Sequence, residues 1–410
     1  MSLSIASIGE TDHGGAGLSS LKLHDQFCRQ GLNAKFYVNR KTSNRDSVLQ
    51  MPTRPGRSRE ISFSVGLFPQ TGGNPLYRNV PFTSGLSVTS EEALDEIHGW
   101  ADVILLRWAS VAISDYTVGR WARLNKPVVW CLSDMAPMTG GCHYSMGCEG
   151  FRSGCYPCPA LAHSDRATKE IAERRARLWK GITFVSPSRW LESSMQKSLI
   201  GEGNNVKYIR TGVELDVFKP TDKSTARYKF GLKPDRKVIL CGSASAREYR
   251  KGFSYLPEIV DRLNRSEIGD YQLMVFGSNS SDLESLNCDV ISMGNIKDRN
   301  KLASIYSAAD LVLLPYIEDN LPNVCLEAIA CGVPVTSFAI GGMPDVIIPG
   351  VNGELATPFN IEELTTKVIK SLSADYSPGE LRSWAVSNID IREQARQYVD
   401  LFSELLDKTR

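Results

Sequence analysis

Short apolar runs alternate along this chain with amphipathic segments of helical period. The runs include ADVILLRW (101–108), PVVWCL (127–132), YQLMVFGS (271–278) and ADLVLLPY (309–316), each of the length of a buried strand. Other segments, such as LSSLKLHDQFCRQ (18–30), IEELTTKVIKSL (361–372) and REQARQYVDLFSELL (392–406), have apolar positions that recur every three or four residues. Strands that alternate with helices predict parallel sheets joined by helical crossovers, which is an α/β architecture.

Length and composition indicate the number of domains. A single hydrophobic core seldom serves more than roughly 250 to 300 residues, so 410 residues with 42% hydrophobic content predict two domains. The formal net charge of +1 gives no sign of a nucleic-acid partner. No apolar run approaches the roughly 20 residues that span a bilayer, and the chain starts with a strand-like segment without a signal peptide. A cytoplasmic protein is therefore predicted, and its ten cysteines are then expected to be thiols or metal ligands.

Residues 309 to 347 follow the order strand, polar loop, helix, strand and Gly-Gly turn, which is a β-α-β unit. Ligands of such units bind outside the carboxyl ends of the strands, where the positive end of the next helix attracts anions. Asp319 lies in the loop and Glu327 one turn inside the helix, so each can reach the hydroxyls of one end of a ligand that carries an anion in its middle. A nucleotide sugar has this form. The alternatives are a helix-capping acid at Asp319 and an exposed helix carboxylate at Glu327.

The same stretch resembles the signature of family-4 glycosyltransferases, retaining enzymes of the GT-B fold, in which an acid, seven residues and Glu precede a small-residue run. Asp319, Glu327 and Cys331-Gly332-Val333-Pro334-Val335 carry the resemblance, with Asp where the family usually has Glu. It implies two Rossmann-like domains that face a central cleft. An acceptor-binding domain would comprise residues 1–185, with a C-terminal helix of residues 391–410 packing back on it, and a nucleotide-sugar-binding domain would comprise residues 186–390.

Cations that meet a diphosphate are expected after the strand KVILCG (237–242). The next loop contains Arg247, Arg250 and Lys251, and Lys251 matches a family lysine, whereas Ala246 replaces the family arginine. Surface cations without a ligand are the alternative. With the Gly-rich turn after the first strand and the family's base-binding backbone, the expected donor-binding residues are Gly14, Gly15, Arg247, Arg250, Lys251, Gly294, Asn295, Ile296, Asp319, Asn320, Leu321, Asn323 and Glu327.

The loop after residues 127–132 is the second informative stretch. Asp134 and the segment Thr139-Gly140-Gly141-Cys142-His143 resemble family-4 enzymes of surface-polysaccharide assembly, which carry a His-Asp pair after this strand. Ser133 replaces that His and cannot carry a proton at neutral pH. The expected catalytic residues are therefore Asp134, His143 and Asp319, with a structural histidine as the alternative at His143.

Four cysteines in the same loop, Cys142, Cys148, Cys155 and Cys158, form the pattern C-x5-C-x6-C-x2-C. Four soft ligands in a Gly-rich segment suit a structural, tetrahedral Zn²⁺ that would order the loop. Only the C-x2-C half has the usual zinc spacing, so reduced thiols and a disulfide pair stay open. Catalysis itself is expected to need no cofactor, because fixed cations and helix ends can stabilise the leaving phosphate.

Two basic stretches, residues 40–59 and the helical segment 166–180, predict peripheral contact with the inner face of a membrane or with an anionic lipid carrier, and a solvated surface is the alternative. The predicted function is transfer of a sugar from a UDP-, GDP- or ADP-linked donor to a saccharide or lipid-linked acceptor, in cell-surface polysaccharide or lipopolysaccharide biosynthesis. Two alternatives are a non-catalytic partner subunit and a nucleotide-sugar epimerase or phosphorylase of the same fold.

Overall fold

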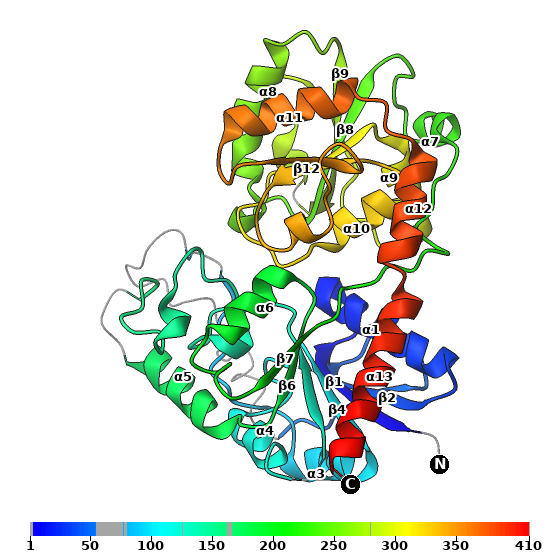
Figure 1. Cartoon of the computed structure of the whole chain (residues 1–410). Coiled ribbons are helices and arrows are strands. Elements are labelled where there is room, and N and C mark those ends of the chain that lie inside the picture. The colour runs from blue at the N-terminus through cyan, green and yellow to red at the C-terminus, as the bar shows by residue number, and fades with distance from the viewer. Residues whose placement is uncertain are drawn as a thin grey trace. The chain divides into compact units, whose positions relative to one another are not determined.

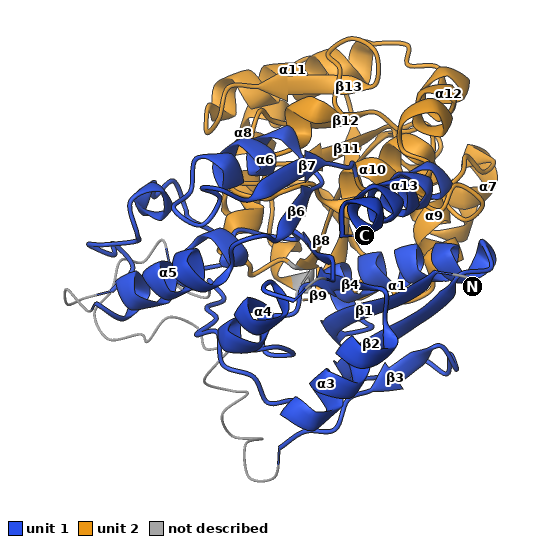
Figure 2. Ribbon diagram, turned by 60° about the horizontal axis from the view of Figure 1, so that its bottom comes forward, with its two compact units in different colours: residues 1–210, 392–410 blue, residues 211–391 orange. Residues whose placement is uncertain are grey.

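The computed structural model of the chain describes residues 3–54, 77, 80–124, 126–161, 166–278 and 280–409. Two compact units make up the chain (Figure 2). The first comprises Met1–Arg210 and Arg392–Arg410, and the second comprises Thr211–Ile391. Each unit is a parallel sheet with helices on both faces (Figure 1).

In the described part of the first unit, seven strands form a sheet in the order β3-β2-β1-β4-β5-β6-β7. Every neighbouring pair is parallel. The elements are β1 (Ser4–Thr11), α1 (Gly14–Arg29), β2 (Asn33–Arg40), β3 (Val48–Gln50), α3 (Glu91–Trp100), β4 (Val103–Arg107), α4 (Asp115–Trp121), β5 (Val128–Cys131), α5 (Ala167–Leu178), β6 (Thr183–Ser186), α6 (Arg189–Gln196), β7 (Asn205–Tyr208) and α13 (Ile391–Thr409).

The buried strands of this sheet supply two hydrophobic cores, one on each face. Successive side chains of a strand point to opposite faces, and in β4 Ile104 and Leu106 join one core cluster while Val103 and Leu105 join the other. The second cluster also contains Ala395, Tyr398, Leu401 and Phe402 of α13, which recur at helical spacing. The C-terminal helix is therefore part of the first unit's core.

In the described part of the second unit, six parallel strands have the order β10-β9-β8-β11-β12-β13. One core cluster of this unit includes residues from Val213 to Ile389. The elements are α7 (Lys223–Lys229), β8 (Lys237–Ser245), α8 (Leu256–Asn264), β9 (Tyr271–Ser278), β10 (Asp289–Ser292), α9 (Arg299–Ala308), β11 (Leu311–Leu314), α10 (Asn323–Ala330), β12 (Val335–Phe338), β13 (Gly353–Ala356), α11 (Ile361–Ser373) and α12 (Pro378–Asn388).

The strand order reverses between β1 and β4 in the first sheet and between β8 and β11 in the second. At such a switch point the helices after the two strands pack on opposite faces of the sheet, and the loops that lead to them line a crevice at the carboxyl edge. The fold therefore marks one position in each unit where a ligand is expected.

The limit between the units differs from the expected one at residue 185. That limit would cut β6, which pairs with β5 from Thr183 to Val185, and β7 pairs with β6 in turn. Because these pairings complete the first sheet, the division falls after Arg210.

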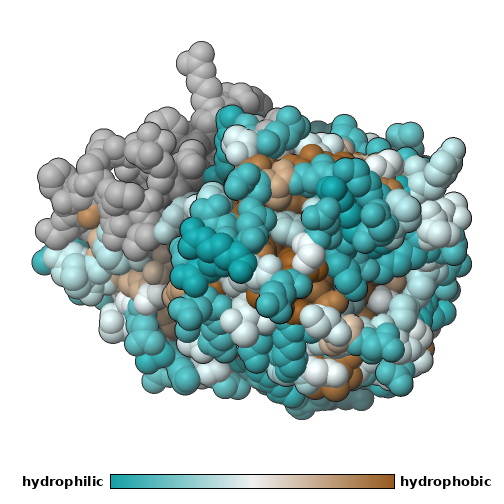
Figure 3. All heavy atoms as spheres, turned by 90° about the horizontal axis from the view of Figure 1, so that it is seen from above, coloured by the Kyte–Doolittle hydropathy of each residue, from teal (hydrophilic) through white to brown (hydrophobic). Residues whose placement is uncertain are grey.

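None of the helices in the described ranges combines the length and apolar character that crossing a membrane requires. On the face shown in Figure 3, hydrophilic residues predominate and hydrophobic residues form separate patches between them.

Candidate functional site

Two loops meet at the switch point of the second unit, one after β8 and one after β11. The Ile317 amide donates a hydrogen bond to the Arg250 carbonyl oxygen at 2.7 Å. Gly252 has a φ of 65°, and a Cβ there would overlap the carbonyl oxygen of Pro315. Only glycine allows this approach, and α8 begins beyond this left-handed residue, at Leu256.

The approach of these loops brings the predicted cations and the predicted sugar-binding acid together. Lys251 Nζ lies 2.6 Å from Asp319 Oδ2, and Arg250 Nη1 lies 3.0 Å from the same oxygen. The other carboxylate oxygen, Oδ1, accepts the Asn320 amide at 2.8 Å. Asp319 is thus held by two charge-assisted hydrogen bonds and one backbone amide.

This ion cluster is buried, and its pKa values reflect that. Lys251 and Asp319 are each 8% exposed. Burial lowers the pKa of Lys251 below its usual value, although Asp319 opposes the shift. Burial alone would raise the pKa of Asp319, but the charges of Lys251 and Arg250 outweigh it and hold that pKa below its usual value. Asp319 is therefore ionised at neutral pH.

Glu327 lies on α10, in the next turn after Asn323, and is buried. The hydroxyl of Tyr306, on α9, donates to Glu327 Oε2 at 3.1 Å. Burial raises the pKa of Tyr306 well above its usual value, so the hydroxyl keeps its proton and stays a donor. The carboxylate is oriented from inside the unit, and an exposed surface role for Glu327 is excluded.

The remaining expected donor-binding residues of the second unit lie around the same edge, with one exception. Asn320 and Leu321 precede α10, which starts at Asn323 without a side-chain cap on its first turn. Gly294 follows β10, with Asn295 and Ile296 next along the chain, and its carbonyl oxygen accepts the Gly277 amide at the end of β9. Arg247 is the exception, because its guanidinium is exposed and pairs with Asp282 at 2.6 Å.

Two residues of this cluster were missed by the sequence analysis. Glu248 Oε1 lies 2.7 Å from Arg250 Nε, and the Tyr316 ring lies 4.2 Å from Lys251 Nζ, with its hydroxyl donating to the Gly242 carbonyl. A single carboxylate among the cations of this loop gives no sequence signal of a binding site. Tyr316 is the last residue of an apolar run, and its position in the sequence indicates only where a strand ends.

In the first unit, Asp134 and His143 form a buried pair after β5. His143 is 1% exposed, and its ring nitrogens lie 2.7 Å from Asp134 Oδ2 and 2.6 Å from Thr83 Oγ1. Asp134 also accepts the Trp108 indole N–H at 3.0 Å and the Ala136 amide at 2.9 Å. Both nitrogens of His143 thus have protein partners, which favours a positioning role over contact with substrate.

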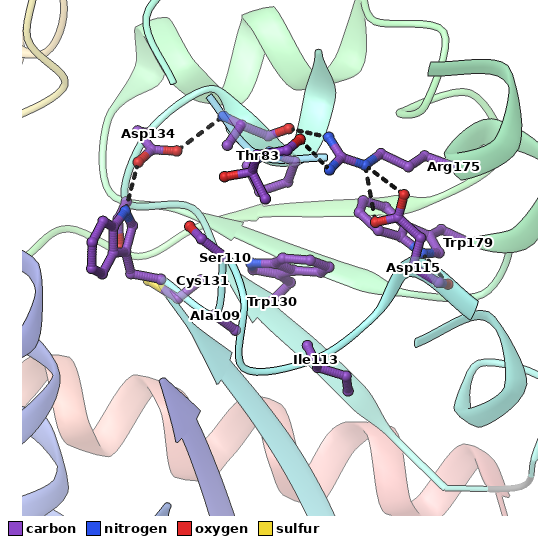
Figure 4. Close-up of a pocket in the computed structure, with 14 residues that line it drawn as sticks. Thr83, Ala109, Ser110, Ile113, Asp115, Trp130, Cys131, Asp134, Arg175 and Trp179 are labelled. Carbon is purple, nitrogen blue, oxygen red and sulfur yellow. Dashed lines mark hydrogen bonds and ion pairs between the residues drawn. The ribbon is translucent and has the colours of Figure 1, made fainter. Parts of the chain in front are cut away.

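Asp134 and Trp108 line a pocket at the carboxyl ends of β4 and β5 (Figure 4). Arg175, on α5, lies along its wall and joins the start of α4 to the loop after β5. Its guanidinium donates to the Asp115 carboxylate at 3.1 Å and to the carbonyl oxygens of Ala136 at 2.7 Å and Thr139 at 3.0 Å. The buried ion pair between Arg175 and Asp115 therefore holds the segments on this side of the pocket in place.

Several described cations of the two basic stretches form ion pairs. Arg174 and Arg175, at the centre of the predicted basic helix, both pair with Asp115. In the other stretch, Arg45 pairs with Asp25 and Arg54 with Glu91, while residues 55–59 lie outside the described part of the chain. These pairs reduce the free charge that membrane contact would use.

Gly14 and Gly15 open α1 at the switch point of the first sheet. Gly14 has a φ of 70°, and a Cβ at either residue would meet nothing within 4 Å. Gly17 differs, because a Cβ there would lie 2.6 Å from the Thr11 carbonyl oxygen. The turn therefore needs Gly14 for its conformation and Gly17 for close packing of α1 on β1.

Cys142, Cys148, Cys155 and Cys158 line a second pocket of the first unit, and all four are free thiols. The amide of Gly140 donates to Cys155 Sγ at 3.0 Å, and burial raises the pKa of the Cys155 thiol to about 11. Within the described ranges, however, no three His, Cys, Asp or Glu side chains are grouped to hold a metal ion. The predicted structural zinc thus gains no support from the geometry.

Two Rossmann-like units of this strand order, one with a buried cation cluster at its switch point, define a class of two-domain nucleotide-binding α/β protein. Comparison with known proteins narrows the class. Residues 235–374, which include the ion cluster and Glu327, match the family model described as glycosyl transferases group 1.

Relatives and solved structures agree with this match. The chain is 26% identical over 388 residues to D-inositol 3-phosphate glycosyltransferase of Mycolicibacterium smegmatis, covering 90% of this chain and 81% of that protein. It is 27% identical over 349 residues to the putative colanic acid biosynthesis glycosyl transferase WcaC of Escherichia coli, covering 78% and 79%.

Among solved structures, sucrose-phosphate synthase from Thermosynechococcus elongatus aligns with a TM-score of 0.70 at 19% identity, over 99% of this chain and 100% of that one. Anabaena Alr3699/HepE, solved in complex with UDP-glucose, aligns with a TM-score of 0.65 at 16% identity, over 98% and 100%. Residues 235–374 form a group 1 glycosyl transferase domain, and the chain is a glycosyltransferase with the GT-B fold. The predicted fold and enzyme class are confirmed.

Proposed function

We propose that the enzyme transfers a sugar, with retention of anomeric configuration, from a nucleotide-sugar donor to a saccharide or lipid-linked acceptor of cell-surface polysaccharide biosynthesis. The observation that carries the proposal is the meeting of Arg250, Lys251 and Asp319 at the carboxyl edge of β8 and β11, with Glu327 one helix turn away. The relative WcaC, named for colanic acid biosynthesis, supports the kind of acceptor.

In this proposal the diphosphate of the donor lies against Arg250, Lys251 and the first turn of α10. Cleavage of the anomeric C–O bond builds negative charge on the leaving phosphate, which fixed cations and the positive end of a helix stabilise. Glu327 binds the ribose hydroxyls and Asp319 the sugar hydroxyls. The backbone of Gly294 to Ile296 lies beside the base.

In this proposal, two residues of the first unit position other side chains and do not contact the donor. Asp134 holds Trp108 and His143 at the wall of the pocket, and His143 fixes Asp134 in turn. Ser133, beside them, lines the same pocket. Catalysis needs no bound metal ion in this scheme, because the charge that develops on the phosphate is met by side chains.

Titration calorimetry of the full-length protein with UDP, GDP and ADP tests the proposal. We expect at least one diphosphate to bind, and Glu327→Ala to weaken that binding at least about tenfold, since a buried acceptor of ribose hydrogen bonds contributes roughly 1.5 to 3 kcal/mol. UDP is the first candidate, because HepE was solved with UDP-glucose.

Glu362→Ala, a change of an exposed carboxylate on α11, is the matched control and should leave the affinity unchanged. Absence of binding for all three diphosphates, together with absence of turnover for their sugars, would contradict the proposal and favour a non-catalytic partner subunit. Product formed without any acceptor would favour an epimerase or phosphorylase.

A further inference from the structure

The cations proposed to hold the donor diphosphate are already occupied by carboxylates of the protein itself. Asp319 Oδ2 lies 2.6 Å from Lys251 Nζ and 3.0 Å from Arg250 Nη1, while Glu248 Oε1 lies 2.7 Å from Arg250 Nε. Two positive and two negative side chains give this cluster no net charge. A diphosphate approaching it meets no excess of positive charge.

The surroundings of Lys251 also leave no room for an incoming phosphate. Its side chain is 10% exposed, and its ammonium group lies between Asp319 Oδ2 and the face of the Tyr316 ring, 4.2 Å away. An ammonium group has three N–H donors, but an incoming phosphate oxygen needs a place beside them. The Asp319 carboxylate holds that place.

The backbone under Asp319 is fixed, so only its side chain is free to change place. A Cβ at Gly341 would overlap the Asp319 carbonyl oxygen, and the Gly342 amide donates to the Asn320 carbonyl oxygen at 2.5 Å. On the other side, the Ile317 amide is bonded to the Arg250 carbonyl. A rotation of the Asp319 side chain off the cations is the smallest motion that exposes them.

We propose that Asp319 is an internal counter-anion, which occupies Lys251 and Arg250 in the free enzyme, moves to the sugar hydroxyls when the donor binds, and returns to expel the nucleoside diphosphate product. The inference rests on the proposed function and adds that Asp319 lowers the affinity of the enzyme for its nucleoside diphosphate product. A ligand that must displace a bound carboxylate binds more weakly than one that finds the cations free. A donor recovers part of this loss through its sugar, whereas a nucleoside diphosphate has no sugar to offer Asp319.

The test is the affinity of the full-length protein for the nucleoside diphosphate that the calorimetric screen selects. We expect Asp319→Asn to bind that diphosphate about tenfold more tightly than the wild type, which corresponds to ~1.4 kcal/mol. We also expect a smaller gain, or a loss, for the matching nucleotide sugar, because the amide loses the charged contact with the sugar. Asp319→Glu keeps the charge and should keep the weak affinity for the diphosphate.

Asp289→Asn is the matched control. Asp289 also lies between a lysine and an arginine, 3.3 Å from Lys233 Nζ and 3.1 Å from Arg236 Nη1, but at the amino end of β10. Its change should leave the diphosphate affinity as it is. A general effect of removing a negative charge from the unit would instead appear in both variants.

An Asp319→Asn protein that binds the diphosphate no more tightly than the wild type overturns the inference and leaves the proposed function intact. Should that variant not fold, Glu248→Gln, which frees Arg250 of its other carboxylate, is expected to bind about threefold more tightly, ~0.6 kcal/mol, and an unchanged or weaker affinity overturns the inference. Absence of binding to the wild type and to both variants defeats the proposed function and the inference together.

Discussion

At the scale of single residues, Lys251 combines a charge with a place where charge is costly. Burial lowers its pKa, and an isolated ammonium group in such a place would lose its proton or its stability. The Asp319 carboxylate 2.6 Å away compensates for the lost water. Lys251 is therefore kept charged inside the protein by its pairing with Asp319.

Replacing Lys251 by alanine tests this role in catalysis. We expect turnover to fall several hundredfold, because a cation that meets charge developing in the transition state contributes on the order of 3 to 4 kcal/mol. Steady-state kinetics with the donor identified by calorimetry measures the effect. Lys233→Ala, which removes a half-exposed lysine of the same unit, should change turnover by less than about twofold, the scale of an exposed ion pair.

Turnover of Lys251→Ala equal to that of the wild type would remove Lys251 from the phosphate site. A folded variant is shown by an unchanged far-ultraviolet circular dichroism spectrum. Loss of folding would instead indicate that Asp319 cannot stay buried beside Arg250 alone.

The role of His143 is likewise decided by the residues that surround it. A histidine with both nitrogens bonded to buried partners, here Asp134 and Thr83, has no nitrogen to offer a substrate. Its contribution lies in fixing the Asp134 carboxylate, which in turn holds the Trp108 indole. The sequence alone left a structural histidine open as an alternative, and the burial of the ring favours it.

At the scale of elements, α5 holds distant segments of the first unit together. Arg175 reaches from this helix to Asp115 at the start of α4 and to the loop after β5, and the Trp179 indole donates to the Asp115 carbonyl at 3.0 Å. Three segments that are distant in sequence are joined by one guanidinium (Figure 4).

Breaking these contacts should cost stability. We expect Arg175→Met to lower the free energy of unfolding by about 3 kcal/mol, at the low end for a broken buried ion pair because Arg174 still pairs with Asp115. For a unit of this size that corresponds to a fall in Tm of roughly 6 to 12 °C, which calorimetric or fluorescence melting measures.

The matched control for that prediction is Arg177→Met on the same helix, where the arginine is exposed. It should shift Tm by no more than about 1 or 2 °C, as surface substitutions do. Equal shifts for the two variants would contradict the role of Arg175 in joining these segments.

At the scale of the whole molecule, the chain enters and leaves the second unit at one place. The Val213 amide donates to the Ile389 carbonyl oxygen at 2.8 Å, and the Ile391 amide donates to the Val213 carbonyl oxygen at 3.1 Å. These two hydrogen bonds join the beginning of the second unit to its end. Its core cluster draws only on residues between them.

A fragment of residues 211–391 should therefore fold alone. We expect a cooperative thermal transition and an affinity for the nucleoside diphosphate within about tenfold of the full chain, because Arg250, Lys251 and Glu327 and their partners all lie in this unit. Circular dichroism and calorimetry measure the two properties. A folded fragment without affinity would show that residues of the first unit are required to hold the diphosphate.

Much of the fold followed from local patterns. Apolar runs such as 101–108 and 309–316 became β4 and β11, because a buried parallel strand needs apolar side chains on both faces and few residue types supply them. The segments 361–372 and 392–406 became α11 and most of α13, because their apolar period matches a helix. The acid pair at Asp319 and Glu327 was recognisable because its spacing lies within one loop and one helix.

Other features had no local signal. After β8 the sequence left open whether Arg247 or Arg250 accompanies Lys251. Only the left-handed turn at Gly252 and its approach to Pro315 bring Arg250 and Lys251 to Asp319, while Arg247 pairs with Asp282. The end of the first unit was placed too early for a similar reason, since β6 and β7 join that sheet by pairing and not by composition.

The sequence by itself determined the two-domain α/β architecture, the glycosyltransferase class and the acidic pair, because periodicity and motif spacing are properties of neighbouring residues. Tertiary structure alone decided which charges touch, which histidine is sealed from solvent and which strands close each sheet. Those outcomes depend on contacts between segments tens of residues apart, and no local pattern records them.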